Sequence, residues 1–65
     1  MKYPCLIVLD GYKVIGTKVG VNGNDILEYI RKNISDISID QFAALKTDGE
    51  ISIEGNTFLF SWIEI

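Results

Sequence analysis

Histidine is absent from this 65-residue sequence, and cysteine and proline occur once each, as Cys5 and Pro4. Histidine is the commonest general acid–base group and the usual activator of serine and cysteine nucleophiles, so its absence argues against triad catalysis in its usual form. A disulfide needs two cysteines, and a structural zinc site needs several Cys or His ligands. We therefore expect no internal disulfide, no metal centre, no cofactor and no enzymatic activity.

Basic residues are also few, with six Lys and Arg against nine Asp and Glu and a net charge of −3. They are scattered along the chain as Lys2, Lys13, Lys18, Arg31, Lys32 and Lys46. A nucleic-acid-binding domain usually gathers such residues into one basic surface. No run approaches the about 20 apolar residues of a membrane span, and the N-terminal apolar run is too short for a secretory signal. We expect a cytoplasmic protein with neither a membrane nor a nucleic-acid partner.

What the chain does contain is a high hydrophobic fraction, 48%, against 23% charged residues. That balance is typical of a folded globular protein and predicts one domain over residues 1–65. A domain of this length buries only roughly 60% of its unfolded surface, so its stability margin is small. Oligomerisation would add to that margin.

The N-terminal third has the composition of a β-hairpin. Residues Tyr3–Leu9 and Tyr12–Val19 are rich in β-branched and aromatic residues, and Asp10-Gly11 between them is a strong hairpin signal. Pro4 has no N–H to donate, which predicts that the first strand begins as an edge strand. Gly16 in the second strand predicts a bulge or a close backbone approach.

Two helices are predicted next. Residues 20–24 break the β pattern, their asparagines offer N-caps, and the apolar spacing of the following residues predicts a helix over Asp25–Ile34. Ser38 and Gln41 have the spacing of a capping box, and Asp48-Gly49 supplies a helix stop, which predicts a second, shorter helix. The alternative is a strand over Phe42–Lys46, which its two alanines disfavour.

The last part of the chain predicts a second hairpin. Residues Glu50–Ile53 alternate polar and apolar, Gly55-Asn56 is a two-residue turn signal, and Thr57–Ile65 forms the final strand. The resulting fold class is α+β. We expect a two-layer ββααββ domain, with a four-stranded, mostly antiparallel sheet and one or two helices on one face.

Three segments resemble functional sites only superficially. Residues 11–18 approach a phosphate-binding loop, but their Thr and Lys are in the wrong order and no helix follows. Asp36, Ser38 and Asp40 have the spacing of a calcium loop, yet the glycine and glutamate that such a loop requires are missing. Cys5 shares a strand face with Tyr3, Ile7 and Leu9 by alternation, and we expect it to be buried and unreactive. We predict no catalytic, cofactor-binding or metal-binding residue.

The final strand is the one feature that points to a function, because it is apolar on both faces. Its aromatic face carries Phe58, Phe60 and Trp62, and its aliphatic face carries Leu59, Ile63 and Ile65. Two short helices cover only one face of a sheet, so the other must meet another chain. We expect the aromatic face to be core. The predicted interface then comprises Leu59, Ile63 and Ile65, with Leu6, Val8 and Ile15 from the first hairpin. In the opposite assignment Trp62 would be the interface anchor.

These features predict a small, non-enzymatic protein-binding module that acts by stoichiometric binding and forms a homodimer. The chain begins with Met and shows no tag or linker, as expected of a complete small open reading frame. Such products are frequent in phages and mobile elements, where they inhibit host defence proteins and would lie in the host cytoplasm. One alternative is a transcriptional regulator in which a dimer gathers Lys13, Lys18, Arg31 and Lys32 into a basic stripe. A very small enzyme or enzyme subunit is the second alternative.

Overall fold

A computed structural model describes all residues, 1–65, and confirms the α+β class with the order ββααββ. The elements are β1 (Lys2–Asp10), β2 (Lys13–Val19), α1 (Gly23–Asn33), α2 (Ile39–Asp48), β3 (Glu50–Ile53) and β4 (Asn56–Glu64). The segment with two possible assignments, Phe42–Lys46, is helical and lies inside α2.

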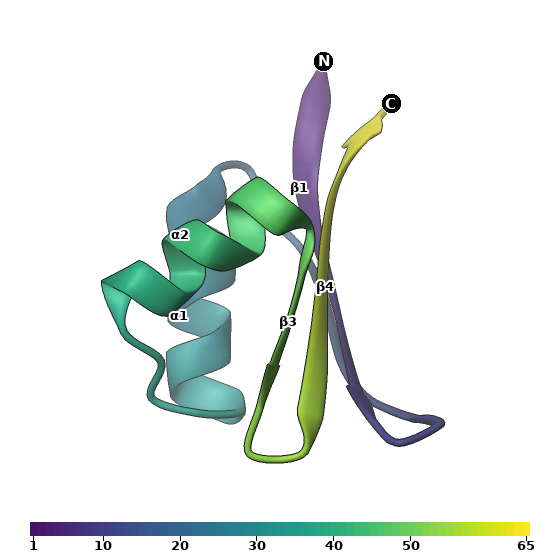
Figure 1. Cartoon of the computed structure of the whole chain (residues 1–65). Coiled ribbons are helices and arrows are strands. Elements are labelled where there is room, and N and C mark those ends of the chain that lie inside the picture. Colours follow the sequence, from purple (N-terminus) through teal and green to yellow (C-terminus); the bar gives the residue numbers. More distant parts are fainter.

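The sheet has the order β2-β1-β4-β3, and every neighbouring pair is antiparallel. The two longest strands, β1 and β4, are therefore central, and they pair along their whole lengths from Lys2 with Glu64 to Asp10 with Asn56. Figure 1 shows the sheet nearly edge-on, with both helices on one side and the two chain ends together. The Ile65 N–H donates to the Met1 carbonyl at 3.2 Å, which closes this end of the sheet.

As predicted, β1 begins as an edge strand at Pro4, because its ladder with β2 runs only from Cys5 to Asp10 and its first residues pair with β4 alone. The proline is tolerated because the ladder between β1 and β2 ends beside it. Its carbonyl accepts a hydrogen bond of 3.0 Å from the Gly20 N–H, just beyond the last residue of β2. The β1–β4 ladder hydrogen-bonds through odd-numbered residues, as the bond between Ile65 and Met1 indicates, so the missing N–H of Pro4 leaves it intact.

Both helices begin at capping boxes. Asn22 caps α1, and its side chain and that of Asp25 each accept a hydrogen bond from the other's backbone N–H. The helix starts two residues before the predicted Asp25, because that carboxylate serves at the third helical position and not at the first. In α2, Ser38 and Gln41 form the predicted capping box, and Gly49 ends the helix in the left-handed conformation.

The second hairpin turns one residue earlier than predicted. Its turn residues are Glu54 and Gly55, and β4 begins at Asn56. Both turn residues have positive φ, 52° for Glu54 and 84° for Gly55, which is the backbone pattern of a type I′ turn. A two-residue turn was correctly predicted, but its position was wrong by one residue. Asn-Gly is the preferred pair in such turns, whereas here Glu54 takes the first position.

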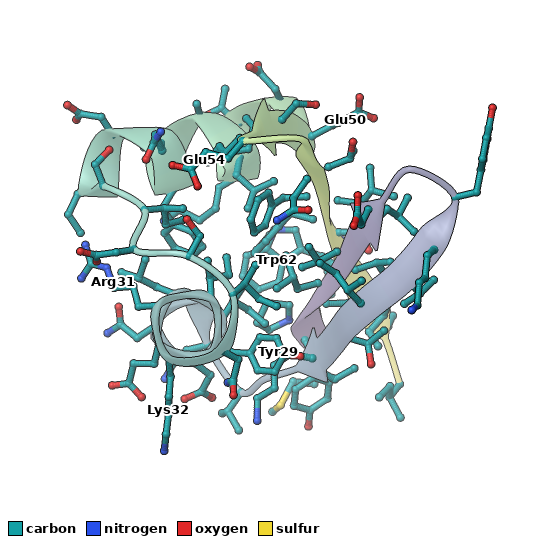
Figure 2. All side chains as sticks on the ribbon, turned by 90° about the horizontal axis from the view of Figure 1, so that it is seen from below. Tyr29, Arg31, Lys32, Glu50, Glu54 and Trp62 are labelled. Carbon is teal, nitrogen blue, oxygen red and sulfur yellow. The ribbon has the colours of Figure 1, made fainter.

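Gly16 lies at a bulge, as predicted, but the groups that approach it closely are side chains and not backbone. The ladder between β1 and β2 slips beside it, leaving Ile15 as an extra residue of β2. A methyl group on Gly16 would lie 2.8 Å from the Tyr29 hydroxyl oxygen and 3.1 Å from the Ile34 side chain, so only glycine leaves room for these contacts. Figure 2 shows Tyr29 reaching from α1 toward the sheet. The glycine therefore lets α1 pack close against β2.

The core lies between the helices and one sheet face. It contains nine buried apolar side chains: Leu6, Val8, Ile26, Ile30, Ile37, Phe42, Leu45, Phe58 and Phe60. Leu27, Tyr29, Ile34, Ile51 and Ile53 are partly buried against it. All four core residues from the sheet come from β1 and β4, so the core is centred on that pair of strands. No element covers the opposite face of the sheet (Figure 1).

Candidate functional site: an uncovered sheet face

The side of the sheet that faces away from the helices forms one continuous surface, which we call the open face. Cross-strand partners in an antiparallel sheet point to the same side, and residues alternate sides along a strand. The ladders therefore identify its members. They are Tyr3, Cys5, Ile7 and Leu9 of β1, Val14, Thr17 and Val19 of β2, Glu50 and Ser52 of β3, and Thr57, Leu59, Ser61 and Ile63 of β4.

The open face is almost free of charge, and its thirteen members include six aliphatic side chains and five that carry a hydroxyl group. An antiparallel sheet with one face in water normally carries polar residues on that face. Here the only charged member is Glu50, at the outer edge in β3. Large apolar side chains are solvent-accessible on the other three strands, including Ile7 at 36%, Val14 at 54% and Val19 at 50%. This composition is typical of a surface that another protein covers.

Three of the predicted interface residues are accessible on this side or at its end. Leu59 and Ile63 belong to the open face, where Leu59 pairs with Ile7 and Ile63 pairs with Tyr3. Both are partly buried, since neighbouring side chains in the sheet shield one another. Ile65 lies one residue beyond β4 and is 81% exposed. The aliphatic side of β4 is therefore the uncovered side.

The assignment of Leu6 and Val8 to the interface is wrong. Both are fully buried in the core beneath the helices. The register of the sheet pairs Leu6 with Phe60 and Val8 with Phe58, so these residues share the aromatic face of β4. The β1 residues that accompany Leu59 and Ile63 are instead Tyr3, Ile7 and Leu9.

Trp62 lies on the helical side of the sheet, as do Phe58 and Phe60, but it is 52% exposed. Its ring packs edge-on against Phe60 at a centroid distance of 5.5 Å. The prediction that the aromatic face is core therefore holds for Phe58 and Phe60 and fails for Trp62. This tryptophan lies on the same side of the sheet as the helices, opposite the open face (Figure 2).

Ile15, the last predicted interface residue, is 39% exposed as the extra residue of the β2 bulge. Five apolar residues of the open face were not among the predicted interface residues: Tyr3, Ile7, Leu9, Val14 and Val19. Alternation groups the β1 residues correctly, but both sets in β1 are apolar and only the strand register selects the set that the helices cover.

Cys5 is a free thiol on the open face, between Val19 of β2 and Ser61 of β4. It is partly exposed, so its predicted burial is wrong. The reason is again the register, which aligns Cys5 with the uncovered set of β1 residues. The thiol lies on a central strand and is a native chemical reporter of whether the open face is covered.

The helical side of the molecule has one recess, of about 260 Å³, between α1 and β2. Its lining residues are Lys18, Asp25, Glu28, Tyr29, Lys32 and Asn33. Two residues of the hypothetical basic stripe, Lys18 and Lys32, meet here, but they are interleaved with two carboxylates. The recess is thus of mixed charge and gives no continuous basic surface of the kind that binds nucleic acid.

No group of three or more Cys, Asp or Glu side chains is placed to hold a metal ion. Neither helix is long and apolar enough to cross a membrane. Comparisons with models of known protein families, with curated proteins and with solved structures gave no match.

Proposed function

We propose that the protein is a non-enzymatic protein-binding module that acts through the open face. The single observation that carries this proposal is a nearly charge-free sheet face with no covering layer. Exposing such a surface to water costs free energy in proportion to its apolar area, at about 25 cal/mol per Å². A protein partner that covers the face recovers that free energy. Binding, in this proposal, is the activity.

Two further features support binding in preference to catalysis. The chain has no histidine, and its one recess is small and of mixed charge. The open face itself contains only apolar side chains, a few hydroxyls, the Cys5 thiol and the peripheral carboxylate of Glu50. Such a face supplies contact area and shape but few groups for acid–base chemistry.

Site-specific photo-crosslinking in living cells tests the proposal. A photoreactive phenylalanine analogue replaces Ile63 on the open face, and the same analogue replaces Val21 as the control. Val21 is 74% exposed in the loop before α1, away from the open face. We expect protein adducts from position 63 and not from position 21. If a folded protein gives no adduct from position 63, or equal adducts from both positions, the open face is not a protein-binding surface.

A further inference from the structure

We propose that the partner on the open face is a second copy of this chain, packed face to face so that two four-stranded sheets form a sandwich. This inference rests on the proposed function, because it names the occupant of the same surface. Three properties of the face favour a second copy: its shape, its charge and its area.

The shape of the face fits another sheet. The recess of the protein lies on the helical side, between α1 and β2, and not on the open face. Twisted sheets pack well on each other, with strands aligned within about 30° and a spacing of about 10 Å. A second copy presents a sheet of identical twist, and a two-fold axis brings the same patch of both copies together.

The charge distribution permits two acidic chains to meet here. Each copy has a net charge of −3, which would oppose association through most of its surface. On the open face only Glu50 is charged, and it lies on an edge strand with water access. The charges of α1 and α2 are on the far side of the sheet. No complementary charge is therefore needed on the partner, which suits a self-complementary contact.

The area of the face matches what a small dimer needs. The strands have nine, seven, four and nine residues. At about 3.3 Å per residue and about 4.8 Å between strands, the face covers roughly 460 Å² in projection. Two copies would then bury on the order of 1,000 Å², the lower bound for a specific interface. Each copy would contribute roughly 460 Å², about a tenth of its 4295 Å² surface, which is the usual share for a small protein.

A sandwich would also give the chain a second core. Alone, the protein has nine buried apolar side chains, all on the helical side of the sheet. Face-to-face packing would bury a second set, centred on Ile7 and Leu59, and would couple association to folding stability. Edge pairing would not do this. The bulge in β2, with Lys13 and Lys18 beside it, and the short β3 both disfavour addition of another strand at the sheet edges.

The experiment combines sedimentation velocity with the reactivity of Cys5 across a micromolar concentration series. We expect the sedimenting mass to rise from the 7.3 kDa of one chain toward twice that value. The rate of Cys5 modification by a soluble thiol reagent should fall over the same concentration range, because the second copy covers the thiol. A monomer at all concentrations, or a dimer in which Cys5 reacts at the monomer rate, would overturn the inference.

Two variants locate the contact. Ile7→Lys places a charge at the centre of the open face and should yield a folded monomer, while Val21→Lys should still dimerise. Should Ile7→Lys fail to fold, Ile7→Thr retains a β-branched residue and should raise the dimer dissociation constant roughly 10- to 100-fold, since each dimer loses two buried apolar groups. Dimerisation that is unaffected by either Ile7 variant would exclude the open face as the contact.

The photo-crosslinking experiment separates this inference from the proposed function. Adducts from position 63 that contain two copies of the chain support both. Adducts that contain only another protein retain the protein-binding function and refute the second copy as the occupant. The absence of any adduct refutes both.

Discussion

Phe60 and Trp62 share one side of β4, with ring centroids 5.5 Å apart, yet Phe60 is 6% exposed and Trp62 is 52% exposed. The difference arises from α2. The Phe42 ring of this helix packs edge-on against Phe60 at 6.2 Å, whereas the aromatic contact of Trp62 is with Phe60. Two aromatic residues with the same sequence signature therefore have different roles, one in the core and one at its border.

This difference predicts unequal costs of truncation. We expect Phe60→Ala to lower the free energy of unfolding by about 3–5 kcal/mol, because it leaves a cavity under α2. For Trp62→Ala we expect a loss of about 1 kcal/mol, since half of the side chain is already in water. Urea unfolding followed by far-UV circular dichroism measures both losses. Equal losses would contradict the placement of Trp62 at the border of the core.

The fluorescence of Trp62, the only tryptophan, distinguishes two dimer geometries. Trp62 is on the helical side of the sheet, so face-to-face packing through the open face leaves its surroundings unchanged. We expect the emission maximum to stay constant while dilution dissociates the dimer. A shift in emission that follows dissociation would instead indicate pairing through the end of β4. The measurement needs no substitution, and the sedimentation profile of the same samples supplies the control.

The turn between β3 and β4 contains a residue, Glu54, whose replacement should stabilise the fold. Glu54 has a φ of 52°, a conformation that costs most non-glycine residues about 1–2 kcal/mol and that asparagine tolerates better. Glu54→Asn should therefore raise the free energy of unfolding by up to about 1 kcal/mol.

Gly55→Ala is the companion variant and should act in the opposite direction. Gly55 has a φ of 84°, and an added methyl group would have no atom within 4 Å. Its expected loss, about 1 kcal/mol, is thus purely conformational. Thermal unfolding of both variants reports the two effects. Stabilisation by Gly55→Ala would show that the turn is not in this conformation.

Arg31 should contribute through its hydrogen bond and not through its ion pair. Its Nε donates to the Ile37 carbonyl at 3.1 Å, in partly buried surroundings. The same atom is 4.0 Å from Asp36, whose side chain is 96% exposed. We expect Asp36→Asn to change the free energy of unfolding by less than about 0.5 kcal/mol. Arg31→Met should lower it by about 1 kcal/mol, because the Ile37 carbonyl loses its donor. Chemical unfolding at low and high salt separates the two, since only the ion pair is screened.

The elements of this fold could be predicted from the sequence because the signals for them are local. The capping box of Ser38 and Gln41 requires residues three positions apart, and Gly49 ends α2 through its own backbone conformation. The hairpins follow from turn residues next to β-rich runs. The predicted boundaries of these elements are wrong by one or two residues in two places. The second turn includes Glu54 one residue earlier than predicted, and α1 starts two residues earlier. In both places more than one polar residue could fill the turn or cap position.

The surplus of apolar surface was also predictable from the sequence alone. A strand with apolar residues on both sides, in a chain with only two short helices, has more apolar surface than one core can bury. What the sequence could not determine is which residues form that surface. The hydrophobic effect is non-directional, and β1 carries apolar residues on both of its sides. Composition therefore does not predict which side packs under the helices.

The register of β1 against β4 determines which side of β1 is buried. Pairing Leu6 with Phe60 and Val8 with Phe58 places these four side chains under the helices and turns Cys5 and Ile7 outward. A shift of one residue would exchange the two faces. The sequence by itself therefore determined the elements and the surplus of apolar surface. The long-range pairing decided which residues form the open face, because a face is shared only by residues that the ladder aligns.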